Sequence, residues 1–397
     1  MSTEETKIFL KRWAPIVTLC VAGVLYINMD MSGQARNAHT GPELTRQLST
    51  AMEQEDFVVD LHLGDSASSI QPQFGGTDEE TSRSLLQVAG GEYDTSDATT
   101  SLPAWTKNLK NIWEPVADDD TPFLWAVPRT GAIAVNDIFT YCLGLRMANH
   151  RGAYTSNATV GVYEYGSNRN LPHVPKLVNV RTSTKAWIDE CEKRELIEAQ
   201  VTDMFISPWL TQAADQLFKT YKARGFVMMR NPVKRIVDEF YFHQHSTQRG
   251  DWNIEKAAMA LHQYISSEYM VENLVTRTLM KKEEDFDISA SEMEVAKEIL
   301  RTKFIVGIHE WFDISILRFE RFFGYVKEFN VLTNLTVNNC HYHSLAYAHH
   351  VGNHPYVPNT EEIHEVIYKR NWADFELYQY AKNLFAYQEK LLPGDEQ

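Results

Sequence analysis

The sequence predicts a three-layer α/β domain with a mainly parallel sheet, preceded by an N-terminal membrane helix. Two strand–loop–helix units predict the sheet: one starts at the apolar run 123–127 and the other at the run 226–229. Short apolar runs bounded by turn residues are typical of buried strands, and helices between strands favour parallel pairing. An uncharged run over residues 13–29 predicts the membrane helix.

The uncharged run follows three basic residues and ends before Asp30. At about 1.5 Å per residue it spans about 25 Å, close to the hydrocarbon thickness of early secretory membranes. The basic residues predict a cytoplasmic tail at residues 1–12 and a lumenal location for the rest of the chain. We therefore predict a single-pass signal anchor at 13–29. A cleaved signal peptide and a buried helix remain as alternatives.

Residues 30–120 are rich in Ser, Thr, Gly, Asp, Glu and Gln and show no sustained period. This composition predicts a flexible lumenal stem that holds a folded domain at residues 121–390 away from the membrane. Glycosylation sequons begin at Asn157 and Asn334, on the lumenal side, so we expect a glycoprotein.

Composition excludes some classes of function. The chain has 397 residues, 44% of them hydrophobic, and a formal net charge of −15, so a sizeable core is expected and a nucleic-acid partner is not. Any anionic ligand needs a local cluster of positive groups. Four cysteines are too few for a disulfide scaffold. Cys20 lies in the membrane run, so Cys142, Cys191 and Cys340 allow at most one bridge among themselves, and the pairing is open.

The first unit continues from the strand into Pro128-Arg129-Thr130-Gly131. A helical pattern then follows at Ile138, Cys142, Leu145 and Asn149. A strand, a tight loop with glycine and a helix together offer backbone N–H groups to an anion. The Walker consensus is absent, which excludes an ordinary nucleotide triphosphatase loop.

The second unit ends its strand at Arg230. Asn231 suits a helix N-cap, and the proline after it suits the first helical position of a helix over 233–242. Arg230 and Lys234 would lie near the positive end of that helix and form a phosphate pocket. The alternative is a plain βα unit whose basic residues are solvated.

Both units resemble the sulfotransferases that use 3′-phosphoadenosine-5′-phosphosulfate (PAPS). VPRTGAIAVNDIFTYCLGL resembles their phosphosulfate-binding loop, and RNPVKRIVDEFYF resembles their 3′-phosphate motif. Further stretches are similar in the right order: VENLVTRTL, AKEILRTKFIVGIHEWFDISILRFERFFGY and NWADFELYQYAKNLFAYQE. The likeness covers residues 121–389 and is closest to Golgi membrane carbohydrate sulfotransferases of the type found in microalgae. It implies a P-loop-like sulfotransferase fold, PAPS as co-substrate, a carbohydrate acceptor and a Golgi-lumenal catalytic domain.

The resemblance also implies site residues. In the family a loop Lys contacts the leaving oxygen, and an Arg and a Ser hold the 3′-phosphate. Arg129 stands at the position of the Lys, Arg230 at that of the Arg and Asp238 at that of the Ser. The cofactor positions so implied are Arg129, Thr130, Gly131, Ala132, Ile133, Ala134, Arg230 and Asp238.

Some of these positions depart from the family pattern. Ile133 and Ala134 lack the hydroxyl donors expected there, and Asp238 is a carboxylate that would repel a phosphate. On the helix surface Asp238 would pair with Lys234 or Arg235. A second hypothesis is therefore a catalytically inactive sulfotransferase-fold protein that binds glycan or partners in the secretory pathway.

The identity of the general base is open, and its candidates lie between the two motifs. The candidates are His150, Glu164, His173 and Asp203. Asp203 is preferred as a catalytic residue because it enters a predicted strand whose carboxyl end would face the cofactor.

No metal site is predicted. The histidine-rich segment 340–354 matches no known ligand spacing. It contains Gly352 and is followed by Pro355, which is typical of a loop. Three interpretations remain for it: a solvated loop, a loop facing substrate or cofactor, and a metal site. Residues 309–313 lack the second histidine of a metalloprotease motif.

Overall fold

The computed structural model describes residues 101–117, 119–152, 159–165, 172–245, 253–282, 287–325, 340, 341, 344 and 361–392. The predicted tail, the predicted membrane helix, most of the predicted stem and both sequon asparagines lie outside these residues. Among the helices that are described, none is both long enough and apolar enough to cross a bilayer.

The described residues form a seven-stranded sheet in the order β3-β4-β2-β5-β1-β6-β7. The strands are β1 (Thr121–Trp125), β2 (Arg146–Ala148), β3 (Val162–Glu164), β4 (Lys176–Val178), β5 (Met204–Ser207), β6 (Ala223–Met229) and β7 (Phe304–Ile308). Neighbouring strands are parallel except for the β3–β4 pair. The prediction of an α/β domain with a mainly parallel sheet is confirmed.

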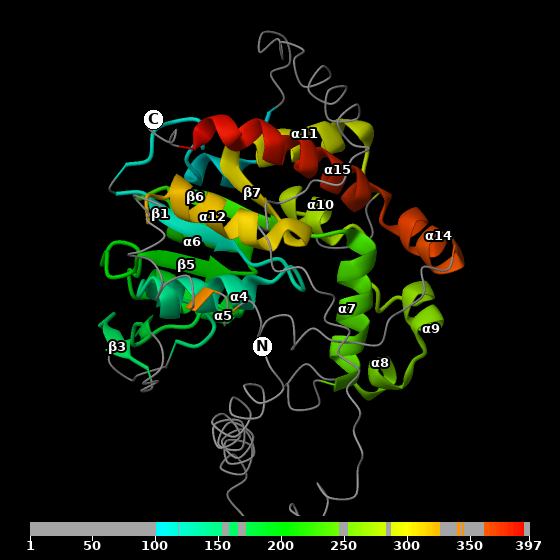
Figure 1. The fold of residues 1–397 in the computed structure, drawn as a ribbon, viewed down its shortest axis with the longest axis horizontal. Coiled ribbons are helices and arrows are strands. Elements are labelled where there is room, and N and C mark those ends of the chain that lie inside the picture. The colour runs from blue at the N-terminus through cyan, green and yellow to red at the C-terminus, as the bar shows by residue number, and fades with distance from the viewer. Residues whose placement is uncertain are drawn as a thin grey trace, which may run out of the picture. The chain divides into compact units, whose positions relative to one another are not determined.

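The helices lie between and after these strands (Figure 1). The α-helices are α4 (Ala132–Asp137), α5 (Lys185–Lys193), α6 (Leu210–Leu217), α7 (Pro232–His245), α8 (Ile254–Ala258), α9 (Leu261–Ser266), α10 (Leu274–Leu279), α11 (Ala290–Lys303), α12 (Phe312–Phe322), α14 (Glu361–Arg370) and α15 (Trp372–Tyr387). Shorter 3-10 or π turns are η1 (Ala104–Asn108), η2 (Ile138–Cys142), η3 (His309–Trp311) and η4 (Gln388–Leu391).

Both faces of the sheet are buried. Along β1, Phe123 and Trp125 belong to a hydrophobic cluster that includes residues of α5, α6, α11 and α15. Leu124, between them, belongs to a second cluster with residues of α4, η2 and α12. Since successive side chains of a strand point to opposite faces, helices cover the sheet on both sides. Burial on both faces explains why the strands are continuous apolar runs in the sequence.

A third hydrophobic cluster lies around α7, which follows β6. Its residues come from α7, α9, α14 and the segment between α9 and α10: Val233, Ile236, Val237, Phe240, Tyr264, Ile265, Met270 and Ile367. The Asn231 side chain accepts hydrogen bonds from the N–H groups of Val233 at 3.0 Å and Lys234 at 3.3 Å, so the predicted N-cap is confirmed. The predicted helix over 233–242 is likewise confirmed as part of α7.

The helix of the first unit is shorter than its sequence pattern suggested. The helical turns end at Cys142, Gly144 has a φ of 70°, and β2 begins at Arg146. Asn149 is therefore not on the helix, and its side-chain amide donates to the Asn136 side chain at 2.7 Å. A glycine in the left-handed region ends a helix readily, which is why the pattern stops there.

The end of the predicted stem belongs to the folded domain. Trp105, Leu109 and Ile112 are each 1% exposed and join the hydrophobic clusters of the sheet. Leu109 also forms a parallel bridge with Ala223 at the start of β6. The boundary predicted at residue 120 is corrected, because the domain already includes residues 101–117.

Candidate functional site

The two predicted loops lie at one edge of the sheet. Strands β1 and β6 are parallel neighbours, with Trp125 paired to Val227. Because parallel strands end at the same edge, the loop after β1 and the turn after β6 come together there. Arg129 comes from the first loop and Arg230 directly follows the second strand. The expectation that these two loops open on one edge is met.

The loop after β1 has an unusual backbone. Arg129 has a φ of 65° and Gly131 a φ of 88°, both in the left-handed region. The Thr130 hydroxyl donates to the carbonyl of Val127 at 2.9 Å and thus holds the turn from inside. A Cβ added to Gly131 would lie 2.7 Å from Phe312 Cε2, so only glycine fits this position without a shift of its neighbours.

Arg129 and Arg230 converge on Asp238 of α7. The Nε of Arg129 and the Nη1 of Arg230 each donate to Oδ2 of Asp238 at 3.0 Å. Arg230 Nη1 also donates to the carbonyl of Arg129 at 2.5 Å. The Arg129 guanidinium lies 4.0 Å from the ring centre of Phe242. Two positive groups thus share one carboxylate oxygen, which is an anion-binding arrangement.

The predicted helix-surface pairs of Asp238 are not formed. Lys234 Nζ lies 4.0 Å from Glu310 instead. Arg235 is 2% exposed and lies 3.2 Å from Glu239 and 3.9 Å from Asp374. Asp238 pairs instead with the two arginines of the sheet edge, which come from other elements of the fold.

The electrostatic field around α7 favours negative charge. Burial alone would raise the pKa of Glu239, but hydrogen bonding from His243 and the charges of Arg235, His243 and Arg129 outweigh it, and this pKa is lowered. The lowered pKa shows that the positive groups near Glu239 stabilise a negative charge at this place.

The other predicted cofactor residues open the helix after the loop. Ile133 is 57% exposed, whereas Ala134 is 6% exposed and Thr130 is 2% exposed. Ala132 and Ile133 begin α4 beside the loop. The Thr130 hydroxyl forms a hydrogen bond within the loop, so this residue stabilises the conformation of the loop.

Asp203 does not join this site. It precedes β5, and β5 is parallel to β1, so Asp203 lies at the amino edge of the sheet. There its carboxylate accepts hydrogen bonds from Arg146, at 2.7 Å from the backbone N–H and 2.5 Å from Nη2. Both residues line a pocket of about 690 Å³ on that edge. The prediction of Asp203 as a catalytic residue is corrected by its place at the opposite edge.

The remaining base candidates lie elsewhere. Glu164 ends β3, which is the outermost strand on the far side of the sheet. The ring of His173 lies against Gly144, 2.7 Å from the position of an added Cβ. His150 follows β2, which is separated from β1 by β5.

Sequence reasoning missed a third loop at the same edge. β7 is parallel to β6, with Met229 paired to Ile308, so His309 leaves the sheet beside Arg230. His309 Cδ2 is 3.2 Å from the position of an added Cβ on Gly131. Glu310 accepts a hydrogen bond from the backbone N–H of Asn231 at 3.2 Å. The signal was present, since His-Glu follows a five-residue apolar run.

Glu310 ties this third loop to the C-terminal helix. The hydroxyl of Tyr378 in α15 donates to Glu310 Oε2 at 2.9 Å. Burial, and then the negative charge of Glu310, raise the pKa of Tyr378, so this hydroxyl keeps its proton. The loops after β6 and β7 are thereby held in one arrangement.

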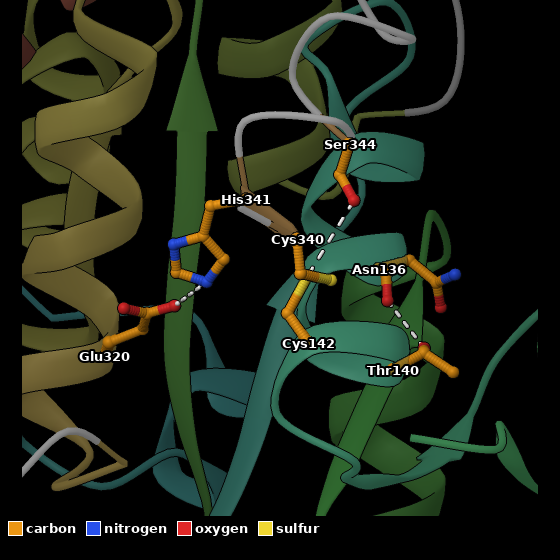
Figure 2. The surroundings of a disulfide bond; sticks show 7 residues. All are labelled: Asn136, Thr140, Cys142, Glu320, Cys340, His341 and Ser344. Atoms are coloured by element: carbon orange, nitrogen blue, oxygen red, sulfur yellow. Dashed lines mark hydrogen bonds and ion pairs between the residues drawn. A yellow bond between two sulfur atoms is a disulfide. The ribbon is translucent and has the colours of Figure 1, made fainter. Parts of the chain in front are cut away.

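A disulfide joins Cys142 to Cys340, and Cys191 is free and buried (Figure 2). Next to the bridge, the ring of His341 lies 3.1 Å from Glu320, which is fully buried. Burial raises the pKa of the Cys191 thiol to about 12. Most of the histidine-rich segment lies outside the described residues, and among those described no group of three or more metal-ligating side chains is found.

Comparison with known proteins assigns the chain to no family. Neither the scan against protein-family models nor the search of curated proteins finds a match.

Proposed function

We propose that this protein is a PAPS-dependent sulfotransferase that transfers a sulfuryl group to a hydroxyl of a carbohydrate. One observation carries the proposal: Arg129 and Arg230, from loops after adjacent parallel strands, converge on one anion. The two loops match in position and order the phosphosulfate and 3′-phosphate motifs that the sequence resembles. The proposal extends to a P-loop-like sulfotransferase fold for the α/β domain.

The chemistry requires positive groups at the departing phosphate, since negative charge develops there when sulfur moves to the acceptor oxygen. Arg129 would serve at this point. Its guanidinium stays charged and binds phosphate in a bidentate manner. Arg230 would hold the 3′-phosphate, and its buried Nε, which has no hydrogen-bond partner among the described residues, offers a further donor. Thr130 and Gly131 shape the loop, and Ala132, Ile133 and Ala134 line the start of α4.

Asp238 must give way for the nucleotide to bind. Its carboxylate now occupies the two donors that a phosphate would use. A phosphate carries more charge and more acceptor oxygens than a carboxylate, so exchange favours the nucleotide once Asp238 turns aside. The fit of the residues to PAPS depends on this exchange.

The same observation favours a second candidate. A permanent Arg129–Asp238–Arg230 arrangement would neutralise the site and leave a catalytically inactive sulfotransferase-fold protein that binds glycan or partners in the secretory pathway. The two candidates differ in one measurable property, the affinity for the nucleotide.

The proposed location is the Golgi membrane, with a single-pass anchor at residues 13–29 and the domain in the lumen. The Cys142–Cys340 disulfide supports a secretory location, because disulfides persist in oxidising compartments and are rare in the cytosol. The acceptor is proposed as a carbohydrate from the resemblance alone.

Calorimetric titration of the full-length chain in detergent with 3′-phosphoadenosine-5′-phosphate (PAP) tests the proposal. We expect binding that weakens about ten- to a hundred-fold in Arg230→Ala, since a charge-assisted hydrogen bond contributes about 1.5–3 kcal/mol. Lys219→Ala, on the surface and paired with Glu192, is the control and leaves the affinity unchanged. A folded protein that does not bind PAP would refute the enzyme and favour the inactive relative.

A further inference from the structure

The edge that carries Arg129 and Arg230 also holds an imidazole. His309 is the first residue after β7, at the same level as Arg230, the first residue after β6. Its Nε2 is 3.5 Å, and its Cδ2 3.2 Å, from the position of an added Cβ on Gly131. The Nε2 side of the ring therefore faces the loop that contains Arg129.

The absence of a side chain at Gly131 makes this contact possible. A Cβ at this residue would meet both His309 and Phe312, so glycine opens the space that the imidazole reaches. The rings of His309 and Phe312 lie 5.7 Å apart in an edge-on arrangement, which restricts the orientation of the imidazole. The next residue, Glu310, is held by the backbone N–H of Asn231 and by Tyr378, so the backbone that carries His309 is held too.

We propose that His309 is the general base that activates the acceptor hydroxyl, an assignment that rests on the proposed function. Imidazole is the side chain most often used for this task, because its ordinary pKa of about 6.5 lies near the working pH. His309 is partly exposed, so an acceptor can reach it from solvent. It replaces Asp203, which lies at the other edge of the sheet.

Nε2 of His309 takes the proton of the acceptor hydroxyl while the acceptor oxygen forms its bond to sulfur. The bond between sulfur and the 5′-phosphate oxygen breaks, and its electron pair stays on that phosphate oxygen beside Arg129. The imidazolium then releases its proton to water.

The first test reads the position of His309 without turnover. Diethyl pyrocarbonate modifies accessible neutral imidazoles, and mass spectrometry of the full-length chain reports each histidine separately. We expect PAP at saturation to slow the modification of His309 by about ten-fold or more, because the 5′-phosphate would occupy the loop that the ring faces. His262, exposed on α9, is the internal control and reacts at the same rate with and without PAP.

The second test compares His309→Gln with the matched variant His262→Gln. We expect His309→Gln to bind PAP like the wild type, which shows that it is folded. Its turnover of radiolabelled PAPS, with water or simple glycosides as acceptors, is expected to fall about a hundred-fold or more. The part of the wild-type pH–rate profile that comes from deprotonation of an imidazole should disappear, since the glutamine has no such proton to lose.

The outcomes separate the two proposals. If PAP binds but does not protect His309, the assignment is overturned and the proposed function stays intact. The same holds if PAP binds and His309→Gln has an unchanged rate and pH profile. PAP binding without any turnover by the wild type also overturns it, because no transfer then needs a base. No PAP binding refutes the proposed function and this assignment with it.

Discussion

Two arginine–aspartate centres lie at opposite edges of the sheet. At the amino edge, the side chains of Arg224 and Asp120 are both 1% exposed, and Arg224 donates to Asp120 at 2.6 Å and to the carbonyls of Asn111 and Glu114 at 3.0 and 2.9 Å. At the carboxyl edge, the side chains of Arg129, Arg230 and Asp238 are 22%, 14% and 9% exposed, and two guanidinium groups share one carboxylate oxygen.

The two centres differ in how far their charged side chains are exposed and in what else the guanidinium groups bind. At the amino edge the Arg224 guanidinium donates to carbonyls of the segment 111–115 as well as to Asp120, and Lys110 Nζ lies 3.1 Å from the same carboxylate. At the carboxyl edge the charged side chains are more exposed, and a buried Arg230 Nε lacks a partner among the described residues. We therefore expect the carboxyl edge, and not the amino edge, to exchange its carboxylate for a phosphate.

The largest effect is expected when the amino-edge pair is broken. Arg224→Met leaves the buried Asp120 carboxylate with Lys110 as its remaining charged partner, and such a loss costs up to about 3–5 kcal/mol of the free energy of unfolding. Urea denaturation of the full-length protein measures it. The control is Lys219→Met, which removes an exposed pair with Glu192, 59% and 43% exposed, and should cost less than about 1 kcal/mol. Equal midpoints for the two variants would contradict the structural role of Arg224.

The next effect concerns the carboxyl edge. Asp238→Ser removes the resident competitor and supplies a hydroxyl donor, so we expect PAP to bind about ten- to a hundred-fold more tightly. Asp238→Glu keeps the negative charge and is the matched control, with affinity near that of the wild type. Asp203→Ser, at the other edge, should leave PAP binding unchanged. Weaker binding in Asp238→Ser would mean that the carboxylate organises the two arginines for the nucleotide.

Gly131 gives a third test of the carboxyl edge. Gly131→Ala places a Cβ at a φ of 88° and 2.7 Å from Phe312, so we expect a loss of about 1–2 kcal/mol from the backbone together with displacement of Phe312 and His309. Thermal unfolding and PAP titration measure both consequences. The control is Gly161→Ala, because an added Cβ at that residue meets no atom within 4 Å. Similar behaviour of the two variants would count against a tightly packed loop.

Local patterns predicted the parts of the site that adjoin their own strands. The runs at 123–127 and 226–229 and the cap at Asn231 are contiguous signals, so both loops could be located from the sequence. The true partners of Asp238 lie 109 and 8 residues away in the chain, and the longer of these contacts arises from strand pairing. Helix spacing instead favoured Lys234 and Arg235 as the partners of Asp238, because this spacing predicts contacts only between residues of the same helix.

Other features depended on long-range pairing or on a weak signal. The contact of His309 with Gly131 exists because β7 pairs with β6. These strands are far apart in the chain, so a short stretch of sequence does not predict their pairing. Trp105, Leu109 and Ile112 do follow helical spacing, but three apolar residues in a polar stretch are too few to predict packing. Asp203 was correctly predicted to enter a strand, which is β5. It precedes the amino end of that strand, at the edge of the sheet opposite the site.

The smallest effect is the pH dependence of the amino-edge pair. Burial alone would raise the pKa of Asp120, but hydrogen bonds from the Ala117 N–H, Arg224 and Lys110 outweigh burial, and the pKa is lowered. A carboxyl with a lowered folded pKa contributes stability that is fully present above its unfolded pKa, about 3.9, and is lost as pH falls through the folded value. Below about pH 4 this loss can reach at most about 1.4 kcal/mol per pH unit for one group.

Asp120→Asn removes this contribution. Its free energy of unfolding should therefore lie below that of the wild type at pH 7 and fall less steeply below about pH 4, where the wild type loses the stability that Asp120 provides. Urea denaturation at a series of pH values measures the two slopes. Asp215→Asn is the matched control, since Asp215 pairs with an exposed Lys281, 53% exposed, and its variant should follow the wild-type slope. Parallel acid slopes for Asp120→Asn and the wild type would show that the amino-edge pair does not hold this carboxyl charged, and the contrast between the two edges would then rest on burial alone.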